Sequence, residues 1–88
     1  MAKRKTPQVV VYTTRHCTHC KQAISQLKSW KVGFREMDIE TNHRAYAEFR
    51  RLRARGVPVI AVGERHLFGF DARRLRQLLE NAGISLSG

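Results

Sequence analysis

The chain has 88 residues, and its 17 lysines and arginines against 7 acidic residues give a formal net charge of +10. This length accommodates one small domain with a modest core, so we expect no second domain. Hydrophobic residues make up 42% of the chain, and no apolar run approaches the roughly 20 residues that a transmembrane helix needs. The composition therefore excludes a membrane protein and indicates a small, strongly basic domain.

Both ends of the chain are predicted to lie outside the folded domain. Residues 1–7 form a basic arm that resembles the start of a signal peptide, but the apolar run behind it, residues 9–12, is only as long as a strand. We therefore expect a cytoplasmic protein. Its folded domain is predicted at 8–83, and its C-terminal tail at 84–88 is expected to be frayed from Ser85 onward.

The first half of the chain predicts a strand, a helix and a second strand. Residues 8–12 are mostly β-branched or aromatic, which favours a buried strand. From residue 17 to about residue 31, apolar residues recur at helical spacing, and we expect Val32–Gly33 to end this helix. Residues 34–39 alternate imperfectly between the two faces and predict another strand.

The middle of the chain predicts a second helix followed by two strands. Residues 43–55 place apolar side chains on one helical face and arginines on another, with Thr41–Asn42 as the N-cap and Gly56 as the stop. Residues 57–62 predict a buried strand, and a tight turn leads from it to a short returning strand at 65–68.

A last helix is predicted to begin after Asp71, a good N-cap, and to end at Gly83. The first strand–helix–strand unit predicts a parallel pair with a right-handed crossover, and the short link between the last two strands predicts an antiparallel hairpin. The expected fold is therefore α/β, a four-stranded mixed sheet flanked by three helices in the order β-α-β-α-β-β-α.

The chain has two cysteines, Cys17 and Cys20, with two residues between them. A disulfide between them would close a loop too short to brace distant elements, and the chain-entropy model gives such a loop only roughly 2 kcal/mol. Secreted domains that depend on disulfides usually have several, at longer spacings. The pair is therefore predicted to have a chemical role.

Three motifs, in this order along most of the chain, resemble the glutaredoxin family and its close relatives, the small redoxins that reduce ribonucleotide reductase. The first is Tyr-Thr-Thr-Arg-His-Cys-Thr-His-Cys at 12–20, where a strand and a loop lead to two cysteines at the start of a helix. The second is Gly-Val-Pro-Val-Ile at 56–60, and the third is Gly-Phe-Asp at 69–71.

The resemblance implies a thioredoxin-like fold and a dithiol–disulfide oxidoreductase that reduces protein or glutathione mixed disulfides with Cys17 and Cys20. It also implies a cis Pro58 and a binding site for a thiol substrate or glutathione at Val57, Pro58, Gly69, Phe70 and Asp71. Glutathione is then the expected co-substrate, with no cofactor tightly bound, and the expected partners are disulfide-containing proteins. Outside this resemblance, Pro58 also fits an edge-strand proline and Asp71 a simple N-cap.

The sequence departs from the family pattern at three places. Thr18–His19 separates the cysteines where glutaredoxins commonly have Pro-Tyr, Gly56 replaces a threonine, and Phe68 replaces the first glycine of a Gly-Gly pair. The last two departures lie at the expected glutathione site. A redoxin reduced by a thioredoxin-reductase-type donor is therefore an open alternative.

Cys17 is expected to be the exposed nucleophile of the pair. It begins the first predicted helix, where unpaired N–H groups and the helix dipole favour a thiolate. Three nearby side chains are predicted to stabilise that charge: Arg15, His16 and His19. Cys20, one turn into the helix, is expected to be buried and to resolve the mixed disulfide. His19 matches a thiolate-stabilising histidine of the protein disulfide isomerase family, and it equally fits an exposed loop residue without a role.

A Cys-x-x-Cys pair also occurs in metal sites, so binding of zinc or of an iron–sulfur cluster is a further open alternative. The four potential ligands are His16, Cys17, His19 and Cys20. Side chains packed this closely in sequence can hardly surround one tetrahedral ion while the chain enters a helix, and no second cluster follows. We therefore expect no bound metal.

The net charge of +10 also fits a nucleic-acid-binding module, with residues 3–5 as an arm and the arginines of 50–55 as a patch. The sequence contains no recognised nucleic-acid-binding motif, and its aromatic residues fall mostly at core-facing positions. We expect only weak, salt-dependent, non-specific binding. The protein is predicted to be a monomer whose charge favours acidic protein partners or the carboxylates of glutathione.

Overall fold

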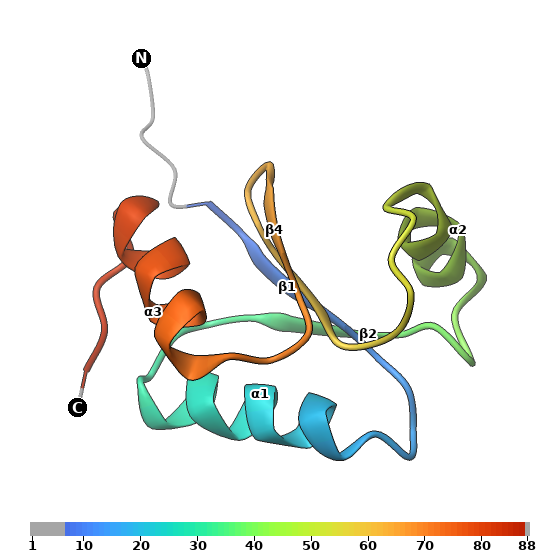
Figure 1. Cartoon of the computed structure of the whole chain (residues 1–88), viewed down its shortest axis with the longest axis horizontal. Coiled ribbons are helices and arrows are strands. Elements are labelled where there is room, and N and C mark those ends of the chain that lie inside the picture. Colours follow the sequence, from blue (N-terminus) through green and yellow to red (C-terminus); the bar gives the residue numbers. More distant parts are fainter. Residues whose placement is uncertain (1–6, 88) are drawn as a thin grey trace.

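Four strands form one mixed sheet, and three helices pack against it (Figure 1). The computed structural model describes residues 7–87, so the predicted basic arm lies outside the described residues except for Pro7. The elements are β1 (Val9–Thr13), α1 (Thr18–Ser29), β2 (Arg35–Asp38), α2 (His43–Arg51), β3 (Val59–Val62), β4 (Arg65–Phe68) and α3 (Ala72–Asn81). This order confirms the predicted one.

The strand order in the sheet is β2-β1-β3-β4. Strand β1 pairs in parallel with β2, placing Val11 opposite Glu36, and β3 runs antiparallel to both β1 and β4. The predicted parallel pair and the predicted hairpin are therefore both present. Strands β2 and β4 are the two edges of the sheet, and β1 and β3 lie between them.

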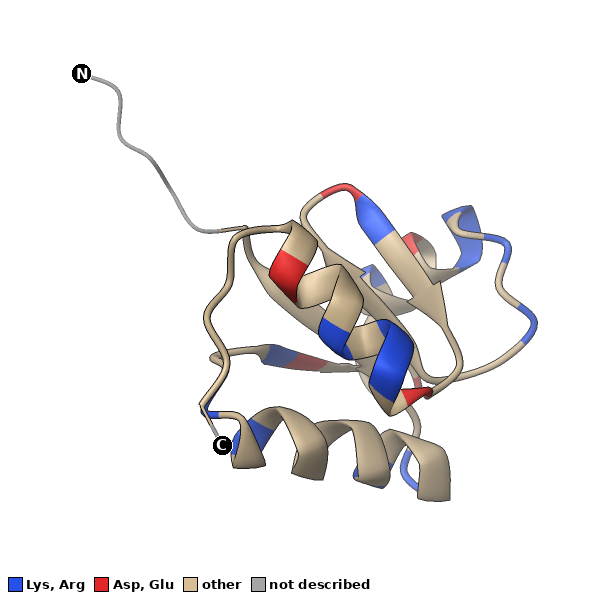
Figure 2. Ribbon diagram, turned by 60° about the vertical axis from the view of Figure 1, so that its left-hand side comes forward, with Lys and Arg blue, Asp and Glu red and all other residues tan. Residues whose placement is uncertain are grey.

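The sheet has a hydrophobic cluster on each face. Helices α1 and α3 cover one face, where they bury residues such as Val11, Leu27 and Leu75. Helix α2 lies on the other face, over a smaller cluster built on Tyr12 and Val59 (Figures 1 and 2). The adjacent central strands β1 and β3 thus contribute apolar side chains to both clusters.

Each helix begins at a side chain that accepts a hydrogen bond from a backbone N–H three residues later. Asn42 accepts from Ala45 at 2.9 Å, and Asp71 accepts from Arg74 at 3.1 Å, as expected for good N-cap residues. The first helix uses Cys17 in the same position. The predicted starts of the last two helices are therefore confirmed.

Helix α1 ends earlier than predicted because Lys31 turns the chain into the left-handed region, with φ 59°. The N–H of Val32 then bonds to the carbonyl of Leu27 at 3.0 Å, and the Val32 side chain is buried. A lysine in this conformation costs about 1–2 kcal/mol, and burial of Val32 offsets that cost. The expectation that Val32–Gly33 ends the helix was wrong for this reason.

Helix α2 is also shorter than the predicted 43–55. The chain leaves the helix at Arg53, whose φ is 56°, whereas Gly56 has no positive φ and is not the stop. The early end allows Leu52 and Ala54 to pack against the Tyr12 cluster. Sequence patterning missed this because the arginine periodicity continues beyond the last helical turn.

The C-terminal segment is packed where fraying was expected. Ile84 and Leu86 contact the core cluster on the α1–α3 face, and the N–H of Ser87 donates to the carbonyl of Trp30 at 2.9 Å. Apolar residues at alternate positions after the last helix thus close the end of the core. Among residues 7–87, no helix has the length and apolar character to cross a membrane.

We predict that Leu86→Ala lowers the free energy of unfolding by about 1–2 kcal/mol, because it exposes part of the core and removes buried apolar area. Ser85→Ala is the matched control, since Ser85 is exposed, and we expect it to change stability by less than about 0.5 kcal/mol. Urea unfolding of the reduced protein measures both. Equal stabilities for the two variants would mean that the segment is frayed in solution.

Candidate active site at the start of the first helix

Cys17 is the N-cap of α1. Its backbone is extended, with φ −127°, and its carbonyl accepts from Lys21 to close the first helical turn. The Cys17 sulfur accepts a hydrogen bond from the N–H of Cys20 at 3.1 Å. A thiol thus takes the position of the usual capping oxygen, where the unpaired N–H groups of the first turn favour negative charge.

Cys17 is half-buried, whereas an exposed thiol was expected. The loop before β3 accounts for the difference, because the Cys17 sulfur lies 3.9 Å from the carbonyl oxygen of Val57. The Val57 carbonyl therefore contributes to the partial burial of Cys17. The structure thus brings the cysteine motif at 12–20 into contact with the Gly-Val-Pro-Val-Ile motif at 56–60.

Cys20 has a different environment from Cys17. Its side chain is only 2% exposed, and burial, followed by its hydrogen bond to Cys17, raises the pKa of the Cys20 thiol to about 12. The charge of Glu36 acts in the same direction, and a backbone hydrogen bond from Thr14 acts against it. The predicted burial of Cys20 is confirmed, and this thiol keeps its proton at neutral pH.

Val57 and Pro58 precede β3, although the predicted strand included them. The peptide bond between them is cis, as the resemblance implied. The sheet ladder begins at Val59, opposite Phe68, so the backbone of Val57 lies outside the ladder and faces Cys17. Pro58 is buried, and its carbonyl accepts the N–H of Gly69 at 2.9 Å. This hydrogen bond brings the third motif beside the second.

The three residues of the third motif have different surroundings. The N–H of Gly69 is already engaged by Pro58, and the φ of Gly69, 88°, suits glycine. The Phe70 side chain packs against the core beside Thr18 and Lys21 of α1. Asp71 is exposed, and its carboxylate caps α3. Roles of these residues in binding a substrate or glutathione remain predictions.

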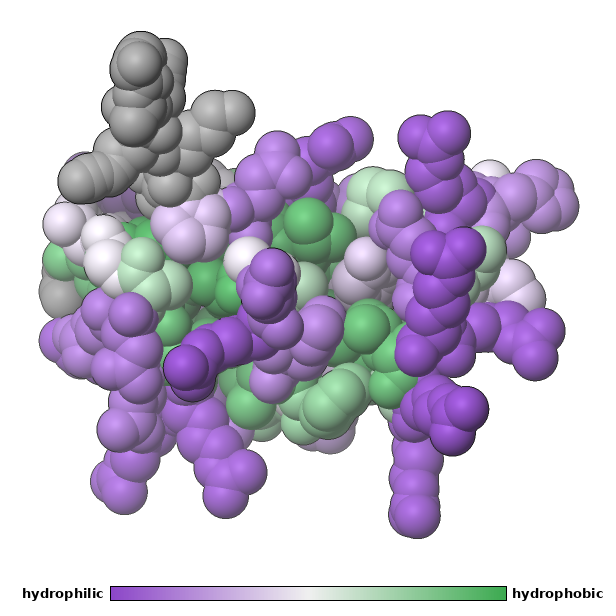
Figure 3. Space-filling model, turned by 90° about the horizontal axis from the view of Figure 1, so that it is seen from above, coloured by the Kyte–Doolittle hydropathy of each residue, from purple (hydrophilic) through white to green (hydrophobic). Residues whose placement is uncertain are grey.

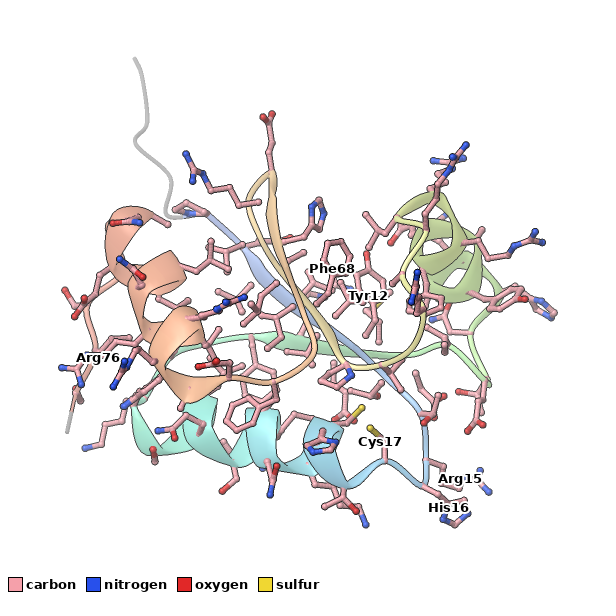
Figure 4. All side chains as sticks on the ribbon, viewed as in Figure 1. Tyr12, Arg15, His16, Cys17, Phe68 and Arg76 are labelled. Atoms are coloured by element: carbon pink, nitrogen blue, oxygen red, sulfur yellow. The ribbon has the colours of Figure 1, made fainter. Side chains whose placement is uncertain are left out.

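The basic side chains around Cys17 are exposed. In Figure 4, Arg15 and His16 project away from the Cys17 sulfur, toward solvent. The backbone N–H of Arg15 bonds to Glu40 at 3.0 Å. Within residues 7–87, no hydrogen bond or ion pair joins Arg15, His16 or His19 to Cys17. Their predicted stabilisation of the thiolate stays a prediction.

Sequence reasoning missed Glu36, whose charge helps to raise the pKa of the Cys20 thiol, and its hydrogen-bond partner Thr13. Thr13 is 2% exposed, and its hydroxyl donates to Glu36 at 3.1 Å. These side chains come from neighbouring strands, and only the register that places β2 beside β1 brings them together. Thr13 at the end of a buried apolar strand was the available signal. In the described part of the chain, no three His, Cys, Asp or Glu side chains are grouped to hold a metal ion.

We predict that iodoacetamide at pH 8 modifies Cys17 alone in the reduced, folded protein, because the thiolate is the reactive form and a pKa of about 12 leaves Cys20 protonated. Mass spectrometry of the intact protein and of its peptides measures the sites. Reaction in denaturant, where both cysteines are exposed, is the control. Modification of Cys20 at a rate similar to Cys17 would contradict the environment described for it.

We also predict that Cys17→Ala lowers the pKa of Cys20 below about 12 and leaves it above the ordinary value of 9.0. The substitution removes the hydrogen bond to Cys17 and its charge, both of which raise the Cys20 pKa, while burial, the largest cause, remains. Titration of the ultraviolet absorbance of the remaining thiolate measures the change. A pKa still near 12 would show that burial acts alone.

Comparison with known proteins places this geometry in a family. The family model described as Glutaredoxin matches residues 9–67. A curated glutaredoxin from Neisseria meningitidis serogroup A is 38% identical over 72 residues, which cover 78% of this chain and 85% of that protein. A glutaredoxin-like 8.6 kDa protein from Clostridium pasteurianum is 29% identical over 73 residues, covering 82% of this chain and 97% of its own.

Solved structures have the same fold. The glutaredoxin-like NrdH-redoxin from Escherichia coli has a TM-score of 0.74 at 20% identity, covering 81% of this chain and 93% of its own. Buckwheat glutaredoxin in complex with glutathione has a TM-score of 0.69 at 17% identity, covering 90% of this chain and 82% of its own. With its Cys17-x-x-Cys20 pair at the start of α1, the chain belongs to the glutaredoxin family of thiol–disulfide oxidoreductases.

Proposed function

We propose that this protein reduces disulfides of protein substrates and mixed disulfides with glutathione, with Cys17 as the nucleophile and Cys20 as the resolving thiol. The observation that supports this assignment is the contrast between the two sulfurs. Cys17 accepts the N–H of Cys20 at the helix N-terminus and is partly accessible, whereas Cys20 is buried and protonated.

In the first step, the Cys17 thiolate attacks one sulfur of the substrate disulfide. A bond forms between Cys17 and that sulfur, the substrate disulfide breaks, and the other substrate sulfur leaves as a thiolate that takes up a proton. The substrate chain next to the attacked sulfur then lies beside the carbonyl of Val57, which is 3.9 Å from the Cys17 sulfur.

In the second step, Cys20 loses its proton and attacks the Cys17 sulfur. The Cys17–Cys20 disulfide forms, and the substrate leaves as its second thiol, so the protein gives up two electrons in all. In the reduced protein, Cys17 itself raises the pKa of Cys20. Those contributions end once Cys17 is bound in the mixed disulfide, so Cys20 ionises more readily at the stage where its attack is needed.

Glutathione is the proposed reductant. One glutathione thiolate attacks the Cys17–Cys20 disulfide and frees Cys20, and a second attacks the glutathione sulfur now bound to Cys17, giving glutathione disulfide and reduced protein. The curated relatives named glutaredoxin, at 38% identity, support this choice. Val57, Pro58, Gly69, Phe70 and Asp71 form the proposed binding segment. This reaction requires a reducing compartment such as the cytoplasm.

A thioredoxin-reductase-type donor is the second candidate. It is favoured by Phe68, which is 57% exposed at the position where the family pattern has glycine. A bulky side chain there occupies surface beside Gly69 that glutathione would need. The E. coli NrdH-redoxin, of the same fold, is described as having a thioredoxin-like activity profile.

The two donors can be separated by reducing the oxidised protein with glutathione plus glutathione reductase in one assay and with thioredoxin reductase in another. We expect thiol release and NADPH consumption with glutathione, and none from Cys17→Ser, which lacks the nucleophile. Turnover with thioredoxin reductase alone would favour the second candidate. Failure with both donors would contradict the proposed reaction. It would favour the alternatives of a protein that binds nucleic acid or an iron–sulfur cluster.

A further inference from the structure

A groove lies beside Cys17 on the face of the sheet that α2 covers. It has a volume of about 460 Å³ and is lined by the loop after α2, notably Arg53 and Arg55, by Val57, and by Phe68 and Gly69 at the end of β4. Val57 belongs to both the groove and the site, because its carbonyl is 3.9 Å from the Cys17 sulfur. A chain bound to Cys17 through a disulfide therefore starts at one end of this groove.

Phe68 gives the groove an apolar surface. It is 57% exposed, and in residues 7–87 only Tyr46 is a comparably exposed large hydrophobic residue. Its ring stacks on His66 of the same strand, with centroids 6.3 Å apart. Viewed from above, hydrophobic residues reach the surface in the middle of the molecule between two groups of hydrophilic ones (Figure 3). An aromatic ring held in this way favours contact with an apolar side chain of a partner.

The loop after α2, which also lines the groove, is positively charged. Within the described range, 7–87, the ion pairs are those of Arg74 with Asp71 and of Arg76 with Glu80, so Arg53 and Arg55 have no acidic partner. Glu48, the nearest acidic residue in sequence, accepts a hydrogen bond from Tyr12 instead. In Figure 2, blue segments recur along the end of α2 and the loop that follows it. The field at this loop therefore attracts carboxylates.

From this combination we propose that the groove binds an extended acidic segment of the protein that contains the substrate disulfide. Aspartate or glutamate residues next to the reacting cysteine would lie against Arg53 and Arg55, and an apolar residue would lie on Phe68. This inference rests on the proposed function and names its substrate class. Glutathione also has carboxylates, but it has no apolar side chain to cover Phe68, so the groove matches a peptide more fully.

The test compares peptides that form mixed disulfides with a small thiol at one cysteine. One peptide has aspartate and glutamate with a leucine beside the cysteine, and its counterpart has asparagine and glutamine instead. We expect a higher kcat/KM for the acidic peptide, with a preference that shrinks as salt increases. In Arg53→Gln/Arg55→Gln, the acidic-to-neutral ratio should fall about fivefold. In Phe68→Ala, kcat/KM should fall more for the peptide with leucine beside the cysteine than for a peptide with serine at that position.

The control is Arg44→Gln/Arg73→Gln, which removes the same charge from exposed positions outside the groove. We expect it to retain the acidic-to-neutral ratio, and circular dichroism would verify that each variant is folded. The proposal would be overturned if the two double variants had the same acidic-to-neutral ratio of kcat/KM, or if the wild type did not prefer the acidic peptide. Reduction of hydroxyethyl disulfide by the wild type tests the proposed function separately, since this substrate has neither a carboxylate for the arginines nor an apolar side chain for Phe68.

Discussion

The hydrogen bond from the N–H of Cys20 to the sulfur of Cys17 is the contact on which this structure depends. It starts helix α1, and it holds the sulfur where the N–H groups of the first turn converge. The first turn contains no acidic residue, so no side-chain carboxylate takes up the field of the helix end. One atom is therefore both the helix cap and the proposed nucleophile, so a change to either role would change the other.

The same short segment gives its two thiols different properties. Cys17, the cap, lies near the Val57 carbonyl and is half-buried, whereas Cys20 is buried and has Glu36 among the groups that raise its pKa. Burial is the largest cause of the raised Cys20 pKa, and the neighbouring sulfur is the second. Because the second cause disappears when Cys17 becomes covalently bound, the arrangement of the site favours the proposed order of the two steps.

Sequence patterns predicted the element order and the helix starts because these depend on local features. Asn42 and Asp71 are capping residues followed by amphipathic stretches, and short-range periodicity is sufficient to find them. The ends of α1 and α2 depend instead on what the next residues bury, which non-local packing decides, so left-handed Lys31 and Arg53 were missed. The pairing of Thr13 with Glu36 required the strand register, which no local motif specifies.

The early end of α2 also creates the loop that lines the proposed groove. A helix continuing through residue 55 would remove the loop whose arginines line the groove together with Phe68. The turn that ends the helix falls on Arg53, where the left-handed backbone costs about 1–2 kcal/mol and glycine would cost far less. Glycine would make the same turn without the charge. An arginine at this position thus gives up some stability and places a cation, unpaired within residues 7–87, on the wall of a groove beside the proposed nucleophile.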